Sequence, residues 1–132
     1  MHRSAEKLTG SKESLPAMLG AYLSPRHRDD VGQGCPLAAL AGDAGRQGPV
    51  LRRVFSDGVL AYLGHLATLR GETGRPGERP LLIATMAALV GALTLSRAVE
   101  DEALSKEILT ATAQVLRGLP VATSEGASDL SA

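Results

Sequence analysis

Several side chains that can bind metal ions lie together in one polar segment of the chain. His27, Asp29 and Asp30 supply an imidazole and two carboxylates there, and all three groups are common metal ligands. No fourth ligand follows at a recognisable spacing, however. We therefore favour a second interpretation, a solvated loop in which Arg26 and Arg28 pair with the two aspartates, and predict no metal site.

The chain has a single cysteine, Cys35, which directly precedes a predicted helix. A thiol at a helix N-terminus can have a lowered pKa and react as a nucleophile. The alternative, which we favour, is that Cys35 is a small buried hydrophobic residue. No histidine with an aspartate or asparagine partner is placed to activate the thiol, and no acid–base pair stands out elsewhere. We predict neither enzymatic activity nor catalytic residues, and we predict no cofactor.

The segment 81–95, with the sequence LLIATMAALVGALTL, is apolar on every side of the helix that it predicts. Leu82, Met86, Leu89 and Leu93 form a bulky stripe, whereas the opposite stripe is made of alanine and glycine. A helix that is apolar all round must be covered all round. We expect the bulky stripe to pack within the chain and the small-residue stripe to pack against a second copy.

Helical periodicity also predicts the other elements, and no segment predicts a strand. We expect an all-α antiparallel bundle of about five helices, at residues 14–23, 36–47, 49–70, 81–99 and 102–117. One domain would span residues 14–118, the usual size of a single domain. Residues 1–13 are expected to be a flexible segment or the remnant of a preceding helix, 71–80 a mobile connector, and 119–132 a disordered tail.

The last two predicted helices, paired with those of a second copy around a twofold axis, would form a four-helix bundle. We expect a homodimer whose interface has small residues on the first helix and larger ones on the second. The interface residues would be Ala84, Ala88, Gly91, Ala92, Leu95, Leu104, Ile108, Ala111 and Val115.

A small-molecule pocket is expected between the helix at 49–70 and the helix at 81–99. Its walls would be mainly apolar with one or two polar groups, which suits a mainly apolar ligand. The lining residues would be Cys35, Phe55, Tyr62, His65, Leu66, Met86, Leu89 and Val90. The alternative for each of them is that it simply fills the core. Gly58 and Gly64 are expected to mark the close approach of another helix or a gap for the ligand.

Composition narrows the choice of binding partner and of cellular location. The 14 basic residues balance the 14 acidic ones, which argues against a domain that itself grips nucleic acid. One cysteine in 132 residues excludes an internal disulfide and fits the cytoplasm, and the N-terminus lacks a secretion signal. The long apolar run is slightly short for a membrane span of about 20 residues, so we expect a soluble protein and no membrane partner.

Three stretches of this chain, in this order, resemble one branch of the TetR/AcrR family of transcriptional repressors. They are YLSPRHRDD (22–30), GCPLAALAGDAGR (34–46) and LVGALTLSRAVEDEALSKEILTATAQVL (89–116). The resemblance covers residues 14–118 and lies in the C-terminal regulatory domain of those repressors. It implies a domain that dimerises through its last two helices and binds a small effector.

The resemblance also implies that effector binding changes the separation of two DNA-reading heads. Operator DNA would be bound only through an N-terminal helix-turn-helix domain preceding residue 1, because no segment here offers a basic recognition helix after a tight turn. The chain would then be a fragment, the product of a truncated reading frame or a stand-alone sensor. Two functions therefore stay open. One is the effector-sensing and dimerisation domain of such a regulator; the other is a structural helical homodimerisation module without a ligand.

Overall fold

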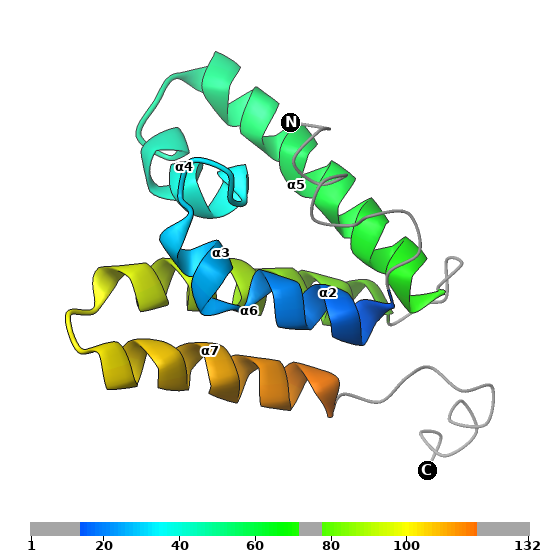
Figure 1. Cartoon of the computed structure of the whole chain (residues 1–132). Coiled ribbons are helices and arrows are strands. Elements are labelled where there is room, and N and C mark those ends of the chain that lie inside the picture. The colour runs from blue at the N-terminus through cyan, green and yellow to red at the C-terminus, as the bar shows by residue number, and fades with distance from the viewer. Residues whose placement is uncertain (1–13, 72–77, 119–132) are drawn as a thin grey trace, which may run out of the picture.

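The computed structural model describes residues 14–71 and 78–118. Every regular element in these ranges is an α-helix (Figure 1), which confirms the predicted all-α fold. The predicted flexible segment 1–13, the predicted tail 119–132 and most of the predicted connector 71–80 lie outside the described residues. The helices are α2 (Leu15–Tyr22), α3 (Pro25–Asp29), α4 (Pro36–Ala44), α5 (Pro49–Arg70), α6 (Glu78–Ala98) and α7 (Glu102–Arg117).

Capping residues set most of these helix ends. Ser14 accepts a hydrogen bond from the backbone N–H of Ala17 at the start of α2, and Asp101 accepts one from Ala103 N–H at the start of α7. Gly71 ends α5 with a φ of 70°, a left-handed conformation that glycine adopts without strain. The ends predicted for these three helices are therefore correct to within a residue or two.

One helix was not predicted. The segment expected to be a solvated loop contains α3, because the Ser24 hydroxyl accepts a hydrogen bond from His27 N–H and Pro25 occupies the first turn. His27 and Arg28 are each only 7% exposed. The loop prediction was wrong, although the expected pairing of Arg28 with Asp29 does form, at 2.9 Å.

Helix α6 is the centre of the arrangement. It forms an antiparallel hairpin with α7 and also contacts α3, α4 and α5 (Figure 1), while α2 packs against α7 and α5. Helix α5 diverges from the hairpin, and α4 packs beside it (Figure 1). The connector before α6 is shorter than predicted, since the helix already begins at Glu78.

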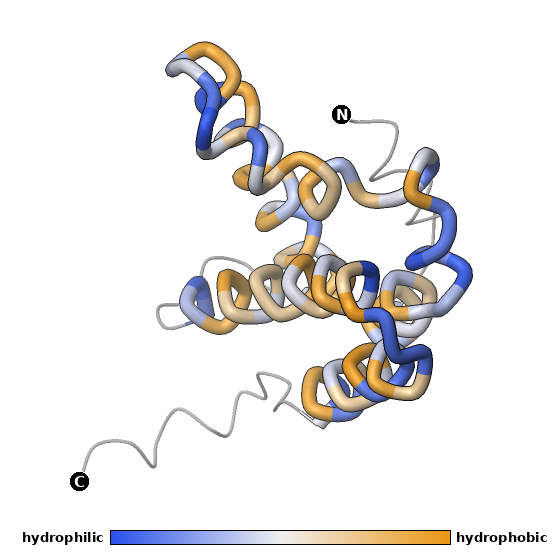
Figure 2. Tube along the Cα trace, turned by 90° about the vertical axis from the view of Figure 1, so that its left-hand side faces the viewer, coloured by the Kyte–Doolittle hydropathy of each residue, from blue (hydrophilic) through white to orange (hydrophobic). Residues whose placement is uncertain are grey.

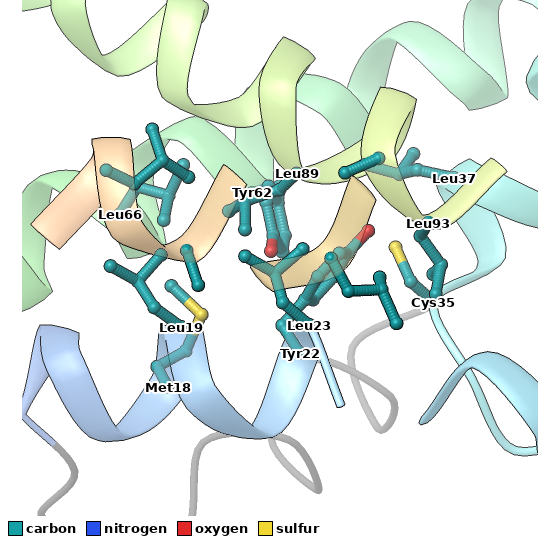
Figure 3. Packing of buried hydrophobic residues seen from close by; sticks show 14 of the residues in the cluster. Met18, Leu19, Tyr22, Leu23, Cys35, Leu37, Tyr62, Leu66, Leu89 and Leu93 are labelled. Atoms are coloured by element: carbon teal, nitrogen blue, oxygen red, sulfur yellow. The ribbon is translucent and has the colours of Figure 1, made fainter. Parts of the chain in front are cut away.

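A core of aliphatic side chains and two tyrosines holds these helices together (Figure 3). The bulky stripe of α6 lies in it as predicted: Leu82, Leu89 and Leu93 are buried, and Met86 packs against them. The largest fully buried side chains are Tyr22, Leu19, Leu66, Leu89, Leu93 and Leu109.

Candidate functional site

The predicted small-residue stripe of α6 forms an open surface on the chain. Ala84 and Leu95 are exposed, while Ala88 and Gly91 are half-buried. A Cβ atom added at Gly91 would have no neighbour within 4 Å, so a second helix has room to come close at this point. Figure 2 shows that α6 is mainly apolar between its charged ends.

The neighbouring helix α7 continues this surface with larger side chains. Leu104 is 42% exposed and Val115 is 66% exposed, Ala111 is exposed and Ile108 is half-buried. The four positions are spaced by four, three and four residues, as are the four on α6, and this spacing is typical of helices that pack in a bundle. We call the two stripes together the outer face; its residues are Ala84, Ala88, Gly91, Leu95, Leu104, Ile108, Ala111 and Val115.

Ala92, the ninth residue of the predicted interface, does not belong to the outer face. It is only 5% exposed and lies in the core. The reason is helical geometry: Ala92 follows Leu89 by three residues, so it shares the inward side of α6 with the core leucines. Ala92 therefore offers no surface to a second copy.

The residues predicted to line a pocket are gathered around the core. Cys35, Tyr62, Leu66 and Leu89 belong to the buried cluster, and Phe55, Met86 and Val90 pack against it. His65, which lies one turn after Tyr62, is half-buried, and its Nε2 atom is buried without a hydrogen-bond partner. Leu66 and Leu89 are fully covered at 0% exposure. At Gly64 no atom lies within 4 Å of an added Cβ, so no helix of the described chain approaches closely there, and the alternative of a gap for a ligand stays a prediction.

The structure adds one residue that the pocket prediction missed. Tyr22 of α2 is 1% exposed, and its ring centroid lies 6.3 Å from that of Tyr62 (Figure 3). Burial raises the pKa of both hydroxyls well above the usual range, so both remain protonated donors at neutral pH. The apolar spacing of 14–23 identified Tyr22 as a core residue, but nothing in the sequence pairs it with Tyr62, forty positions along the chain.

An open groove of about 390 Å³ lies elsewhere, between α2 and α7. Three of its lining residues are buried apolar residues, Leu23, Leu109 and Ala113. The others are Gly20, Thr110, Gln114 and Arg117. The groove contains none of the residues predicted to bind a ligand.

A buried polar network attaches α3 to the hairpin. Arg28 donates to the Ser105 hydroxyl at 2.8 Å and to Glu102 at 3.0 Å, and Ser105 in turn donates to the Ser96 carbonyl at 2.7 Å. Arg97 of α6 donates to the carbonyls of Arg28 and His27. These bonds satisfy the buried guanidinium, so the network is a structural one.

His27 is the second part of this attachment. Its Nε2 accepts a hydrogen bond from Cys35 N–H at 3.0 Å, so the proton of the neutral ring lies on Nδ1, 2.6 Å from the Tyr22 carbonyl. Burial and, to a lesser extent, the charge of Arg97 lower the His27 pKa. A Cβ added at Gly34 would lie 2.9 Å from Arg97 Nη2 and 3.0 Å from His27 Nε2, which explains the glycine before Cys35.

Neither the sequence nor the structure of this chain could be matched to known proteins: comparison with protein-family models, curated proteins and solved structures found no match. Within the described residues, no group of three or more histidine, cysteine or acidic residues could hold a metal ion. Helix α6 is long and apolar enough to span a membrane by length and composition, with 33% of its most apolar window buried in the chain. That pattern is also found in core helices, and the fold is compatible with a soluble protein.

Proposed function

We propose that this chain is the effector-sensing and dimerisation domain of a transcriptional regulator of the TetR/AcrR type, acting as a cytoplasmic homodimer. The observation that carries the proposal is the outer face, an apolar surface of small and large side chains on the same two helices that resemble the family's dimerisation hairpin. Operator contact is assigned to a helix-turn-helix domain joined to this one. None of the described helices is assigned to it.

A second copy fits the outer face for a physical reason. Small side chains on α6 face solvent beside larger ones on α7, and a twofold axis would place the large side chains of each copy over the small stripe of the other. Ridges of this kind pack into grooves in helical bundles. Left open, the exposed leucine and valine side chains on these stripes would remain in water.

The sensing part of the proposal rests on the core between α5 and α6. An effector that entered among these residues would move α5 relative to the hairpin, and the hairpin is where two copies would be fixed to each other. Such a displacement would change the separation of whatever domains the two copies carry. An effector bound in this way would contact the displaced arrangement of α5 differently from the closed one, and an allosteric effector requires such a difference between two states.

A structural homodimerisation module without a ligand is the second candidate. The complete burial of Leu66 and Leu89 favours it, because a closed core needs no ligand. Both candidates share the outer face. They differ only in whether the core opens for a small molecule.

Sedimentation equilibrium of the full chain at micromolar concentration tests the homodimer, which both candidate functions share. We expect twice the chain mass of 13.6 kDa. Ala88→Glu and Gly91→Glu should each shift the population to monomer, because a buried unpaired charge costs about 3–5 kcal/mol. Val54→Glu, at a 46% exposed position on α5, is the matched control and should leave the dimer intact.

A wild-type monomer with unchanged helicity would contradict the dimer. Sedimentation of the chain with lipid vesicles would instead indicate that a membrane covers α6. Thermal-shift screening with lipophilic and aromatic compounds separates the two candidates: stabilisation by any class supports a sensor, and its complete absence supports the structural module.

A further inference from the structure

Two hydroxyl groups in the core have no hydrogen-bond partner among the residues that the structure describes. Tyr22 and Tyr62 are 1% and 8% exposed, and their Oη atoms are buried and unpaired. The Cys35 thiol lies close enough to the Tyr22 hydroxyl to help raise its pKa, but a thiol is a weak hydrogen-bonding group, and the geometry between the two groups falls short of a hydrogen bond. Buried polar groups are nearly always paired in native proteins. Two unpaired donors in one cluster therefore point to a missing partner.

The two hydroxyls come from different helices and lie in one part of the core. Tyr22 is on α2 and Tyr62 on α5, with their rings tilted by 50° at a centroid separation of 6.3 Å. Figure 3 shows both phenolic oxygens among the aliphatic side chains that fill this region. A single small acceptor could therefore lie between helices that are distant in sequence.

The surroundings select against a charged partner. The tyrosines are surrounded mainly by hydrophobic side chains of the buried cluster, and the His27 ring lies 4.7 Å from that of Tyr22, with its pKa lowered chiefly by burial. The cation that acts on the Tyr22 hydroxyl is Arg97, whose guanidinium already donates to the carbonyls of Arg28 and His27. An ionised ligand would lose its hydration and would have to compete with these carbonyls for the guanidinium, which is costly. A neutral acceptor would lose much less.

We propose that Tyr22 and Tyr62 together recognise a neutral, mainly apolar carbonyl compound, whose oxygen accepts a hydrogen bond from one or both phenols. This inference rests on the proposed function, because it specifies the chemistry of the effector. The hydrocarbon part of the ligand would contact Leu66, Leu89 and their neighbours. The carbonyl oxygen would supply the partner that both hydroxyls lack.

Helix α5 is the element that would move to admit such a ligand. Only Tyr62, Leu63 and Leu66 of its 22 residues are buried, all in its C-terminal half. The N-terminal half carries the exposed side chains of Val50, Leu51 and Val54, and it reaches the core only through the partly buried Phe55 and Val59. Segments with few buried contacts open at the lowest free-energy cost.

Calorimetric titration of the full chain with three probes of similar size tests the proposal. The probes are acetophenone, ethylbenzene and benzoate, which share a phenyl ring and differ in the acceptor and its charge. We expect acetophenone to bind most tightly and benzoate not at all. Tyr62→Phe and Tyr22→Phe should each weaken acetophenone binding by about tenfold, the usual effect of one hydrogen bond, and leave ethylbenzene binding unchanged.

Thermal unfolding of the unliganded variants provides a second readout. Because the hydroxyls are unpaired, Tyr62→Phe and Tyr22→Phe should keep or raise the Tm. A lowered Tm would show that a buried water or another group already pairs with the hydroxyl and would overturn the inference. Equal binding of acetophenone and ethylbenzene, binding of benzoate, or binding of no probe would also overturn it.

Failure of this inference can be distinguished from failure of the proposed function. Sedimentation of the same samples reports the dimer independently of the ligand. A dimer that does not prefer the ketone would reject only the chemistry proposed for Tyr22 and Tyr62. A monomer with tyrosine-dependent ketone binding would reject only the dimer.

Discussion

Two stripes of α6 are offset by a single residue, yet one is buried in the core and the other faces outward. The outward stripe is Ala84, Ala88, Gly91 and Leu95; the inward stripe is Thr85, Leu89, Ala92 and Ser96. The inward stripe is buried although it contains two hydroxyl groups, whereas the outward stripe is open or half-open although it is entirely apolar. Polarity alone would have predicted the reverse.

The difference has two physical causes. Thr85 and Ser96 each donate to a carbonyl of their own helix, at 2.8 and 2.9 Å, so burial leaves no hydroxyl unpaired. The outward stripe stays open or half-open because none of the described helices covers it. The contrast shows that an apolar face needs a packing partner but does not determine which one. The partner can be another molecule.

The largest effect is expected on the inward stripe. Leu89→Ala removes a fully buried side chain and should lower the free energy of unfolding by about 2–5 kcal/mol. Leu95→Ala, at a 56% exposed outward position, is the control and should change the stability of the monomer by less than about 0.5 kcal/mol. Urea denaturation of both variants in the monomeric Gly91→Glu background checks this, and equal losses would break the comparison.

A smaller loss is expected from the polar network behind the hairpin. Ser105→Ala should cost about 1–3 kcal/mol of unfolding free energy, because the Arg28 guanidinium and the Ser96 carbonyl each lose their bond to the hydroxyl. Equilibrium denaturation measures it. Thr94→Ala, which removes an exposed hydroxyl bonded to its own helix, should change little, and an equal effect of the two substitutions would argue against the network.

The pH dependence of the free energy of unfolding should reveal the contribution of His27. Its pKa is lowered in the folded chain, so below the ordinary value of about 6.5 the unfolded chain binds more protons. The stability contribution is therefore complete above about pH 6.5 and is lost as the pH falls through the lowered pKa, by up to about 1.4 kcal/mol per pH unit for one proton.

Protonation of His27 would also replace the acceptor of Cys35 N–H by a donor. The charged and titratable groups that act on His27 are Arg97, which opposes protonation, and Asp30, which favours it. Denaturation of wild type and His27→Gln between pH 5 and 7.5 isolates the contribution. An identical slope in both would exclude His27 as its source.

The smallest effects come from a matched pair of glycines in helix interiors. Added Cβ atoms at Gly64 and Gly91 meet nothing within 4 Å in the isolated chain. Alanine should therefore stabilise each helix by about 0.5–1 kcal/mol. If a second copy covers the outer face, Gly91→Ala alone should also weaken the dimer. Thermal unfolding with sedimentation sharpens the comparison, and identical behaviour of the two variants would indicate that nothing packs on Gly91.

Local signals in the sequence predicted much of the fold. Ser14, Gly71 and Asp101 specified helix ends because capping depends on a few neighbouring residues. The bulky stripe of α6 specified its buried side because burial follows the helical period. Among the candidate site residues, Tyr62, Leu66 and Leu89 lie in one buried cluster, and eight of the nine expected interface residues lie on an open or half-open surface. That they bind a ligand or a second copy stays a prediction.

Other features depended on contacts between distant segments. His27 and Arg28 read as residues of a solvated loop because the groups that pair with Arg28, above all Ser105 and Glu102, lie more than seventy positions away. Tyr22 gained its significance only when α2 brought it beside Tyr62.

The sequence by itself determined where helices begin and end and which faces are apolar, because hydrogen bonding and side-chain period act within a few residues. Only the tertiary structure decided that the stripe containing Gly91 stays uncovered by the described helices, and that Arg28 is buried. Those outcomes depend on which neighbours arrive from elsewhere in the chain, and the free energy of burial exists only once they are in place.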